Sequence, residues 1–152
     1  MSTQVKPIPD GYHSVTPYLM VEGVADLIDF LKEAFEAVET ERLPGPDGKV
    51  GHAEVRIGDS VLMMGEGDRY GLMPAAIYLY VEDVDACYTR ALAAGATSLM
   101  EPADQFYGDR SGGVKDPFGN LWFVATRKED VSPEELARRV EARAKSSAPP
   151  EN

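Results

Sequence analysis

The sequence predicts an α+β fold made of two tandem βαβββ modules and a C-terminal helix. One strand-like segment, one helical segment and three further strand-like segments occur in that order, and the same order then starts again. Short sequence matches between the two halves lie about 60 residues apart. The chain has 152 residues, of which 43% are hydrophobic, which is enough for one domain with a well-packed core.

The first module is expected at about residues 10–66. Ser14–Val21 is rich in β-branched and aromatic residues, as a strand would be, although Pro17 cannot donate a hydrogen bond to a neighbouring strand. Apolar residues at positions 24, 27, 28, 31 and 35 then have the spacing of one helical face. Three strands are expected to follow, with turns at 44–48 and 58–59: Ala37–Leu43, Gly51–Ile57 and Ser60–Gly65.

The second module is expected at about residues 74–127. It begins with a strand, Ala75–Val81, and continues with a helix, Val84–Ala94, which Gly95 should end. A long loop is expected between the first two of the later strands, and it contains Pro102, Phe106, Tyr107, Gly108 and Arg110. These later strands are Thr97–Met100, Gly112–Lys115 and Asn120–Thr126.

An internal duplication explains the repeated order of elements. Val-Glu-Gly-Val at 21–24 and Val-Glu-Asp-Val at 81–84 are 60 positions apart, and Ile57–Val61 matches Phe118–Trp122 with a slip of one residue. The shared offset favours a duplication over an ordinary α+β domain whose helices happen to begin with similar residues. Residues 1–127 therefore form a single two-module domain.

A separate helix is expected at about 131–146. Ser132-Pro133-Glu134-Glu135 has the pattern of a capping box with proline at the first helical position. The helix is charged on most sides, so we expect it to pack lightly on the domain or on a second subunit. Residues 147–152 are expected to be a disordered tail.

Composition excludes several classes of function. There are 15 Lys and Arg residues against 26 Asp and Glu, and the net charge of −11 disfavours binding to nucleic acid. No apolar stretch is long enough to span a membrane, and the N-terminus does not have the pattern of a signal peptide, so we expect a cytoplasmic protein. The single cysteine, Cys87, rules out an internal disulfide and a Cys-rich zinc site, and we expect it to be an inert buried thiol.

Three sequence stretches carry a resemblance to a known family: Gly51–Ser60, Phe106–Arg110 and Asp116–Trp122. Together with the duplicated module, they make residues 10–127 similar to the vicinal oxygen chelate superfamily, which contains glyoxalase I, bleomycin-resistance proteins and extradiol dioxygenases. The finer resemblance is to its PhnB-like branch. It implies a half-open curled sheet with helices on the convex side, a ligand cavity on the concave side and a homodimer.

The resemblance also implies where a metal would bind. Metal-dependent members place His, Gln or Glu ligands on the first and last strands of each module, and the aligned positions here are Thr16, Met63, Ala76 and Phe123. Met, Ala and Phe offer no suitable donor, and one Thr hydroxyl is a poor ligand. We therefore expect no metal at these positions and no other cofactor. This argues against a metal-dependent glyoxalase or dioxygenase.

If those positions face the cavity, alternation along the strands predicts the other lining residues. The strand residues expected to contact a ligand are Tyr18, Met20, Met63, Tyr78, Tyr80 and Phe123. Aromatic and Met side chains suit the apolar pockets that bind small organic molecules. The alternative is that these side chains fill one another's space as core.

Polar ligand contacts are expected from His52 and Glu54, which with Arg56 alternate on one face of a strand. They are also candidate catalytic residues, because a carboxylate two positions along can orient an imidazole. The alternative is a solvated strand face, and a third donor that would make a metal site is missing from this strand. His13 is expected to be a surface or packing residue.

Tyr107 and Arg110, on the long loop, are the remaining predicted ligand contacts. Arg110 would hold an anionic or planar group, or alternatively fasten the loop to Asp109 or Glu101.

The first functional hypothesis is a metal-free protein that binds, and thereby sequesters, a small aromatic or cationic compound, in the manner of the bleomycin-resistance relatives. The second is a metal-independent isomerase, lyase or hydrolase that uses His52 and Glu54. The third is a non-catalytic structural or regulatory dimer. The expected partners are a small organic ligand and a second copy of the chain, without nucleic acid or membrane.

Overall fold

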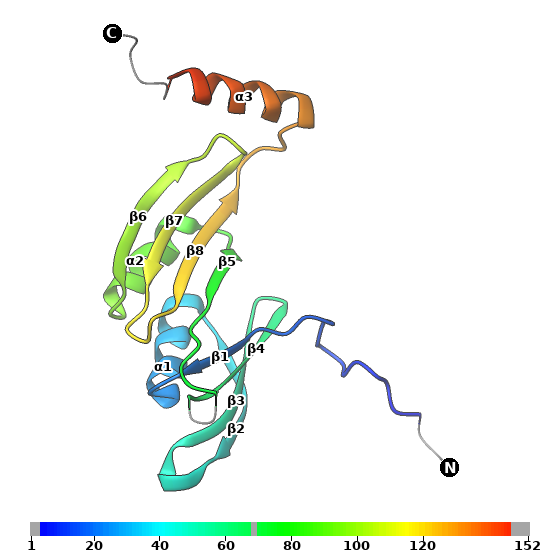
Figure 1. Cartoon of the computed structure of the whole chain (residues 1–152), viewed down its shortest axis with the longest axis vertical. Coiled ribbons are helices and arrows are strands. Elements are labelled where there is room, and N and C mark those ends of the chain that lie inside the picture. The colour runs from blue at the N-terminus through cyan, green and yellow to red at the C-terminus, as the bar shows by residue number, and fades with distance from the viewer. Residues whose placement is uncertain (1–3, 68–69, 147–152) are drawn as a thin grey trace.

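The computed structural model describes residues 4–67 and 70–146, and it confirms the predicted fold class (Figure 1). The first module contains β1 (Tyr18–Val21), α1 (Val24–Phe35), β2 (Val38–Pro44), the short 3-10 helix η1 (Pro46–Gly48), β3 (Val50–Ile57) and β4 (Ser60–Glu66). The second contains β5 (Ala76–Tyr80), α2 (Val84–Ala93), β6 (Thr97–Asp104), β7 (Asp109–Lys115) and β8 (Leu121–Arg127). The helix α3 (Pro133–Ser146) follows.

The two modules have the same sheet topology. The strand orders are β1-β4-β3-β2 and β5-β8-β7-β6, and the first strand of each module runs parallel to the last. Tyr18 lies opposite Met63 in the first sheet, and Tyr78 lies opposite Phe123 in the second. The matching registers support the internal duplication. The sheets are open and separately hydrogen-bonded (Figure 1), so the described chain does not by itself form the curled sheet that the resemblance implies.

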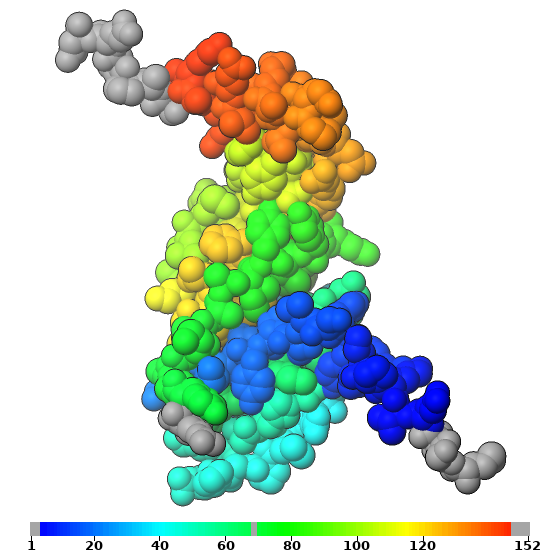
Figure 2. Space-filling model, turned by 45° about the vertical axis from the view of Figure 1, so that its right-hand side comes forward, coloured from blue at the N-terminus to red at the C-terminus, as the bar shows by residue number. Residues whose placement is uncertain are grey.

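One hydrophobic core joins the modules, because α1 and α2 lie on the same side of the molecule. The apolar stripe of α1 is fully buried at Leu27, Ile28 and Leu31, as its spacing predicted. The helices α1 and α2 pack against each other, and the Phe35 and Trp122 rings lie with their centroids 4.7 Å apart. The result is an elongated molecule with its described ends far apart (Figure 2).

A buried carboxylate organises the turn before β8. Asp116 Oδ1 accepts hydrogen bonds from the backbone N–H groups of Phe118 and Asn120 at 2.8 and 3.0 Å. Its Oδ2 accepts from Asn120 Nδ2 at 2.9 Å and from Trp122 Nε1 at 2.8 Å. Hydrogen bonds to an ionised acceptor are the stronger kind, so this one side chain fixes the turn and the central indole together.

The predicted long loop in the second module is wrong, because the structure has a β-hairpin there. β6 continues to Asp104 and β7 starts at Asp109, which leaves a turn of four residues. Pro102 and the neighbouring glycines made this stretch look irregular. However, β6 is the edge strand of its sheet, where a proline breaks no ladder on the solvent side, and its pairing with β7 is interrupted by register shifts.

The first strand is shorter than predicted. It spans Tyr18–Val21 rather than Ser14–Val21, because regular pairing begins only after Pro17. The Pro17 carbonyl still accepts a 2.9 Å hydrogen bond from the Met63 N–H, so the preceding segment stays attached to β4.

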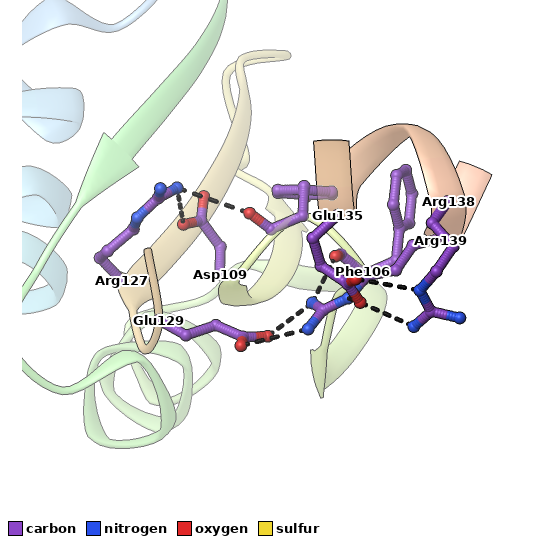
Figure 3. Close-up of polar contacts among 8 residues, drawn as sticks. Phe106, Asp109, Arg127, Glu129, Glu135, Arg138 and Arg139 are labelled. Atoms are coloured by element: carbon purple, nitrogen blue, oxygen red, sulfur yellow. Dashed lines mark hydrogen bonds and ion pairs between the residues drawn. The ribbon is translucent and has the colours of Figure 1, made fainter. Parts of the chain in front are cut away.

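The C-terminal helix begins where the capping pattern predicted, since Ser132 Oγ accepts a 3.1 Å hydrogen bond from the Glu135 N–H. Arg139 fastens the helix to the second module by contacting Glu129 at 2.7 Å and the Phe106 carbonyl at 2.9 Å (Figure 3). The predicted tail, 147–152, lies outside the described residues. Among residues 4–67 and 70–146, no helix combines the length and apolar content needed to cross a membrane.

We predict that Asp116→Asn destabilises the fold by about 3 kcal/mol, because the new amide group would face buried N–H donors that it cannot satisfy. Urea unfolding followed by circular dichroism measures this loss. Asp59→Asn is the matched control, since Asp59 is an exposed carboxyl in the turn before β4, and it should change stability by less than about 0.5 kcal/mol. Equal losses in the two variants would contradict the role given to Asp116.

Candidate functional site

Each sheet has one face covered by a helix and one open face. On β1, Leu19 and Val21 are buried under α1, whereas Tyr18 points the other way and is 44% exposed. On β5, Tyr78 and Tyr80 are 43% and 59% exposed. These aromatic side chains are therefore not core residues in the described chain, and their rings are available to a ligand.

The open face of the first sheet carries a chain of four hydrogen-bonded side chains. His52 Nε2 lies 2.7 Å from Glu54 Oε2, and His52 Nδ1 lies 3.2 Å from the Tyr18 hydroxyl. The Tyr12 hydroxyl, from the segment before β1, donates to the other Glu54 oxygen. Alternation along β3 places His52 and Glu54 on the same face, as predicted, with Ala53 buried on the other.

Glu54 is an unusual residue for an open face, because it is only 4% exposed. Burial by itself raises the pKa of this carboxyl group, but hydrogen bonds from Tyr12 and His52 outweigh it, and the net pKa lies below the ordinary value. The ionised form is thus favoured at neutral pH. It can orient the His52 ring and accept its N–H.

A groove of about 420 Å³ opens beside this cluster. Glu54 and Met63 line it from the sheet, and Tyr12, His13 and Thr16 line it from the N-terminal segment. His13 is exposed, in keeping with the surface position expected of it.

A second polar cluster lies on the open face of the other sheet. Asp109, at the start of β7, is 2% exposed, and its Oδ2 accepts hydrogen bonds from the hydroxyls of Tyr78 and Tyr80, both at 2.8 Å. The Tyr107 hydroxyl lies 3.3 Å from that of Tyr78. Arg127 Nη1 lies 3.5 Å from Asp109 Oδ1, a long contact for an ion pair (Figure 3).

This arrangement keeps the phenols neutral. Burial, with hydrogen bonds to Tyr107 and Asp109, raises the pKa of Tyr78 well above its usual range. The hydrogen bond to Asp109 is the main cause of the raised pKa of Tyr80. Sequence reasoning missed Asp109 as a site residue because it placed this stretch in a loop. Alternation along a strand starting at 109 would have indicated it.

Arg110 points elsewhere. Its guanidinium group contacts Asp85 on α2 at 2.8 and 2.9 Å and Asp104 at 3.3 Å, so it ties the β6–β7 hairpin to the helix. The alternative that Arg110 fastens this segment therefore fits the geometry, with other partners than those expected, and a ligand-binding role stays a prediction. Cys87 is buried, and desolvation raises the pKa of its thiol to about 11, which keeps it protonated and unreactive.

The four positions that hold a metal in metal-dependent relatives do not suit one here. The register sets Tyr18, not Thr16, opposite Met63, and Tyr78, not Ala76, opposite Phe123. Neither Met63 nor Phe123 carries an oxygen or imidazole donor. The donor set therefore does not fit the metal that the resemblance implies.

The six predicted strand contacts fall into two groups. Tyr18, Met20 and Met63 lie on the first sheet, and Tyr78, Tyr80 and Phe123 lie on the second. Met20 is also bridged to Met73 by backbone hydrogen bonds of 3.2 and 2.8 Å. The described chain thus presents two open half-sites.

Comparison with known proteins agrees with this architecture. Residues 11–124 match the model of the Glyoxalase/Bleomycin resistance protein/Dioxygenase superfamily. The chain belongs to this superfamily. It is 40% identical over 135 residues to the uncharacterized protein Mb0911c of Mycobacterium bovis, covering 81% of this chain and 89% of that protein. The uncharacterized protein Rv0887c of Mycobacterium tuberculosis has the same identity over 81% of this chain and 79% of its own length.

Solved structures share the fold. TioX from Micromonospora sp. ML1 superposes with a TM-score of 0.66 at 25% identity, covering 76% of this chain and 98% of TioX. The PhnB protein from Bacillus cereus superposes with a TM-score of 0.60 at 20% identity, covering 75% of this chain and 99% of that one. The second likeness is one of fold alone.

We predict that Asp109→Asn lowers the pKa of the Tyr80 phenol toward its ordinary value of about 10. The carboxylate accepts the phenol proton in a hydrogen bond and so stabilises the protonated form; removing its charge makes ionisation easier. NMR titration of labelled tyrosine rings, with Tyr80→Phe to assign the resonance, measures the midpoint. An unchanged midpoint would show that Asp109 does not hold this hydroxyl.

Proposed function

We propose that this superfamily member binds a small organic molecule on the open faces of its sheets, without a metal at Thr16, Met63, Ala76 and Phe123. One observation carries the proposal. Tyr78 and Tyr80 are held over the buried carboxylate of Asp109 by their hydroxyls and are 43% and 59% exposed, and the Tyr107 hydroxyl lies 3.3 Å from that of Tyr78. Rings held in place by their hydroxyl groups form a rigid, amphipathic surface of the kind that binds small molecules.

The chemistry of this cluster favours an aromatic or cationic ligand. The tyrosine faces attract cations as well as other rings, and the buried carboxylate adds negative charge beneath them. The net charge of −11 attracts cations over longer distances. Arg127 already sets a planar cation beside Asp109, with its Nη1 3.5 Å from the carboxylate, which is an example of the kind of group that suits this cluster.

The finer family assignment is also part of the proposal. The stretches Gly51–Ser60, Phe106–Arg110 and Asp116–Trp122 favour the PhnB-like branch, and the fold of the Bacillus cereus PhnB protein is consistent with it. A role in sequestering a compound follows the bleomycin-resistance relatives of this superfamily. Such a role would suit a cytoplasmic protein, which is the location expected from the sequence.

We expect a thermal-shift screen of cationic and aromatic compounds, antibiotics included, to give at least one ligand that raises Tm. Tyr80→Ala should weaken binding of that ligand by about tenfold, or ~1.4 kcal/mol, because it removes an exposed ring from the contact surface. Tyr88→Phe is the control, since it removes a hydroxyl from α2, on the helix side. No response across the panel, or undiminished binding by Tyr80→Ala, would contradict the proposal.

A second candidate function rests on the Tyr18–His52–Glu54 chain. With Nε2–H donating to Glu54, His52 Nδ1 is free to accept the Tyr18 proton, so the pair can act as an acid–base unit in a metal-independent isomerase, lyase or hydrolase. Activity on a carbonyl or ester substrate should then survive a chelator and fall by about 10²-fold or more in His52→Ala. Loss of the activity in chelator would reject this candidate.

We also propose a homodimer. Each sheet leaves exposed tyrosine side chains on its open face, and a second copy of the chain can cover them and close a cavity between modules. Light scattering at micromolar concentration should give twice the 16.6 kDa chain mass. A single-chain mass over the whole concentration range would show that the half-sites stay open.

A further inference from the structure

Outside the four family positions, the structure brings three metal-binding side chains together. They are Glu41 on β2 and His52 and Glu54 on β3, and one donor atom from each lies within 4.8 Å of the other two. The sequence alone indicated only two possible metal donors here, His52 and Glu54, without a third. We propose that Glu41, His52 and Glu54 bind one divalent transition-metal ion, which excludes the metal-independent use of His52 and Glu54 considered above.

An irregularity in the strand pairing supplies the third donor. Glu39 lies opposite Val55 and Glu41 lies opposite Glu54, so Thr40 is an extra residue in β2. Such a bulge turns the following side chains over, and here it moves the Glu41 carboxylate to the face of Glu54. Glu39, in contrast, contacts Lys32 of α1 at 3.9 Å and so faces the helix side. The bulge therefore places the carboxylates of Glu39 and Glu41 on opposite faces of the sheet.

The charge of the cluster is unbalanced without a cation. Glu54 is nearly completely buried, and Glu41 lies directly opposite it in the strand pair. Like charges directly opposite each other in a sheet are destabilising. In residues 4–67 and 70–146, no Lys or Arg nitrogen lies within 4.0 Å of either carboxylate; His52 pairs with Glu54 at 2.7 Å, and Glu41 has no ion-pair partner within that distance. A divalent cation between the two carboxylates offsets this repulsion.

The donor types select the kind of metal. One imidazole nitrogen and two carboxylate oxygens suit Zn²⁺ and similar first-row ions, whereas Ca²⁺ and Mg²⁺ prefer oxygen alone. Three protein ligands leave at least one coordination position open. That position is accessible, because Glu54 lines the groove of about 420 Å³ beside the N-terminal segment.

Two tyrosines complete the surroundings of these ligands. The Tyr18 hydroxyl lies 3.2 Å from His52 Nδ1, where it can accept the ring N–H once Nε2 is bound to the ion. The Tyr12 hydroxyl donates to Glu54. Hydrogen bonds to the outer atoms of metal ligands fix their orientation, and they are typical of built metal sites.

The test uses the full chain and Zn²⁺ alone. The protein is stripped with chelator, dialysed against Zn²⁺ and analysed for metal, with Co²⁺ in a parallel sample as an optical probe of coordination. The wild-type chain should hold about one equivalent. Binding should weaken at least about tenfold in Glu41→Gln and His52→Ala. Glu41 is exposed, so its variant should remain folded, which circular dichroism verifies.

A matched control locates the ion. Glu39→Gln makes the same change two residues away on the helix side and should keep the full equivalent. No bound Zn²⁺ in the wild-type chain would overturn the proposal, as would a full equivalent in both Glu41→Gln and His52→Ala. The compound screen with Tyr80→Ala reports on the other sheet, so failure of either proposal is seen separately.

Discussion

The structure depends on one constraint, which is that only one face of each sheet is covered. Side chains alternate between the two faces of a strand. Because Leu19 and Val21 are buried under α1, Tyr18 beside Leu19 points to the opposite face. No helix of residues 4–67 or 70–146 covers that side. Polar groups placed there can bond to water or to partners within the sheet. The tyrosine hydroxyls find them in two buried carboxylates, Glu54 through His52 and Asp109 directly.

The two modules share their sheet topology and register but not their chemistry. The register makes Gly113 the counterpart of Glu54, because they pair with Phe123 and Met63 respectively. A Cβ at Gly113 would lie 3.3 Å from the Phe123 ring, so this ring occupies the space that a carboxylate side chain takes in the first module. The carboxylate of the second module comes instead from Asp109, four residues earlier. One half-site is therefore rich in His and Glu, and the other in tyrosine.

Periodicity predicted the helices and most strands, because a buried stripe and a half-buried alternation leave direct marks in the sequence. Periodicity did not predict the features that are set by the register of backbone pairing between strands. Pro102 and nearby glycines hid a hairpin that an edge strand tolerates, and with it the position of Asp109. The bulge at Thr40 likewise hid Glu41, since the residue opposite Glu54 depends on a register that hydrophobic pattern alone does not encode.

The central claim is that the open sheet faces, and not the helix side or the α3 junction, contact a ligand. The most direct test is to titrate a ligand found in the compound screen into the isotope-labelled chain and to record amide NMR spectra. The account predicts that the largest shift changes lie on β5, β7 and β8 around Tyr78, Asp109 and Phe123. Changes concentrated on α1, α2 or α3, with these strands unaffected, would contradict it.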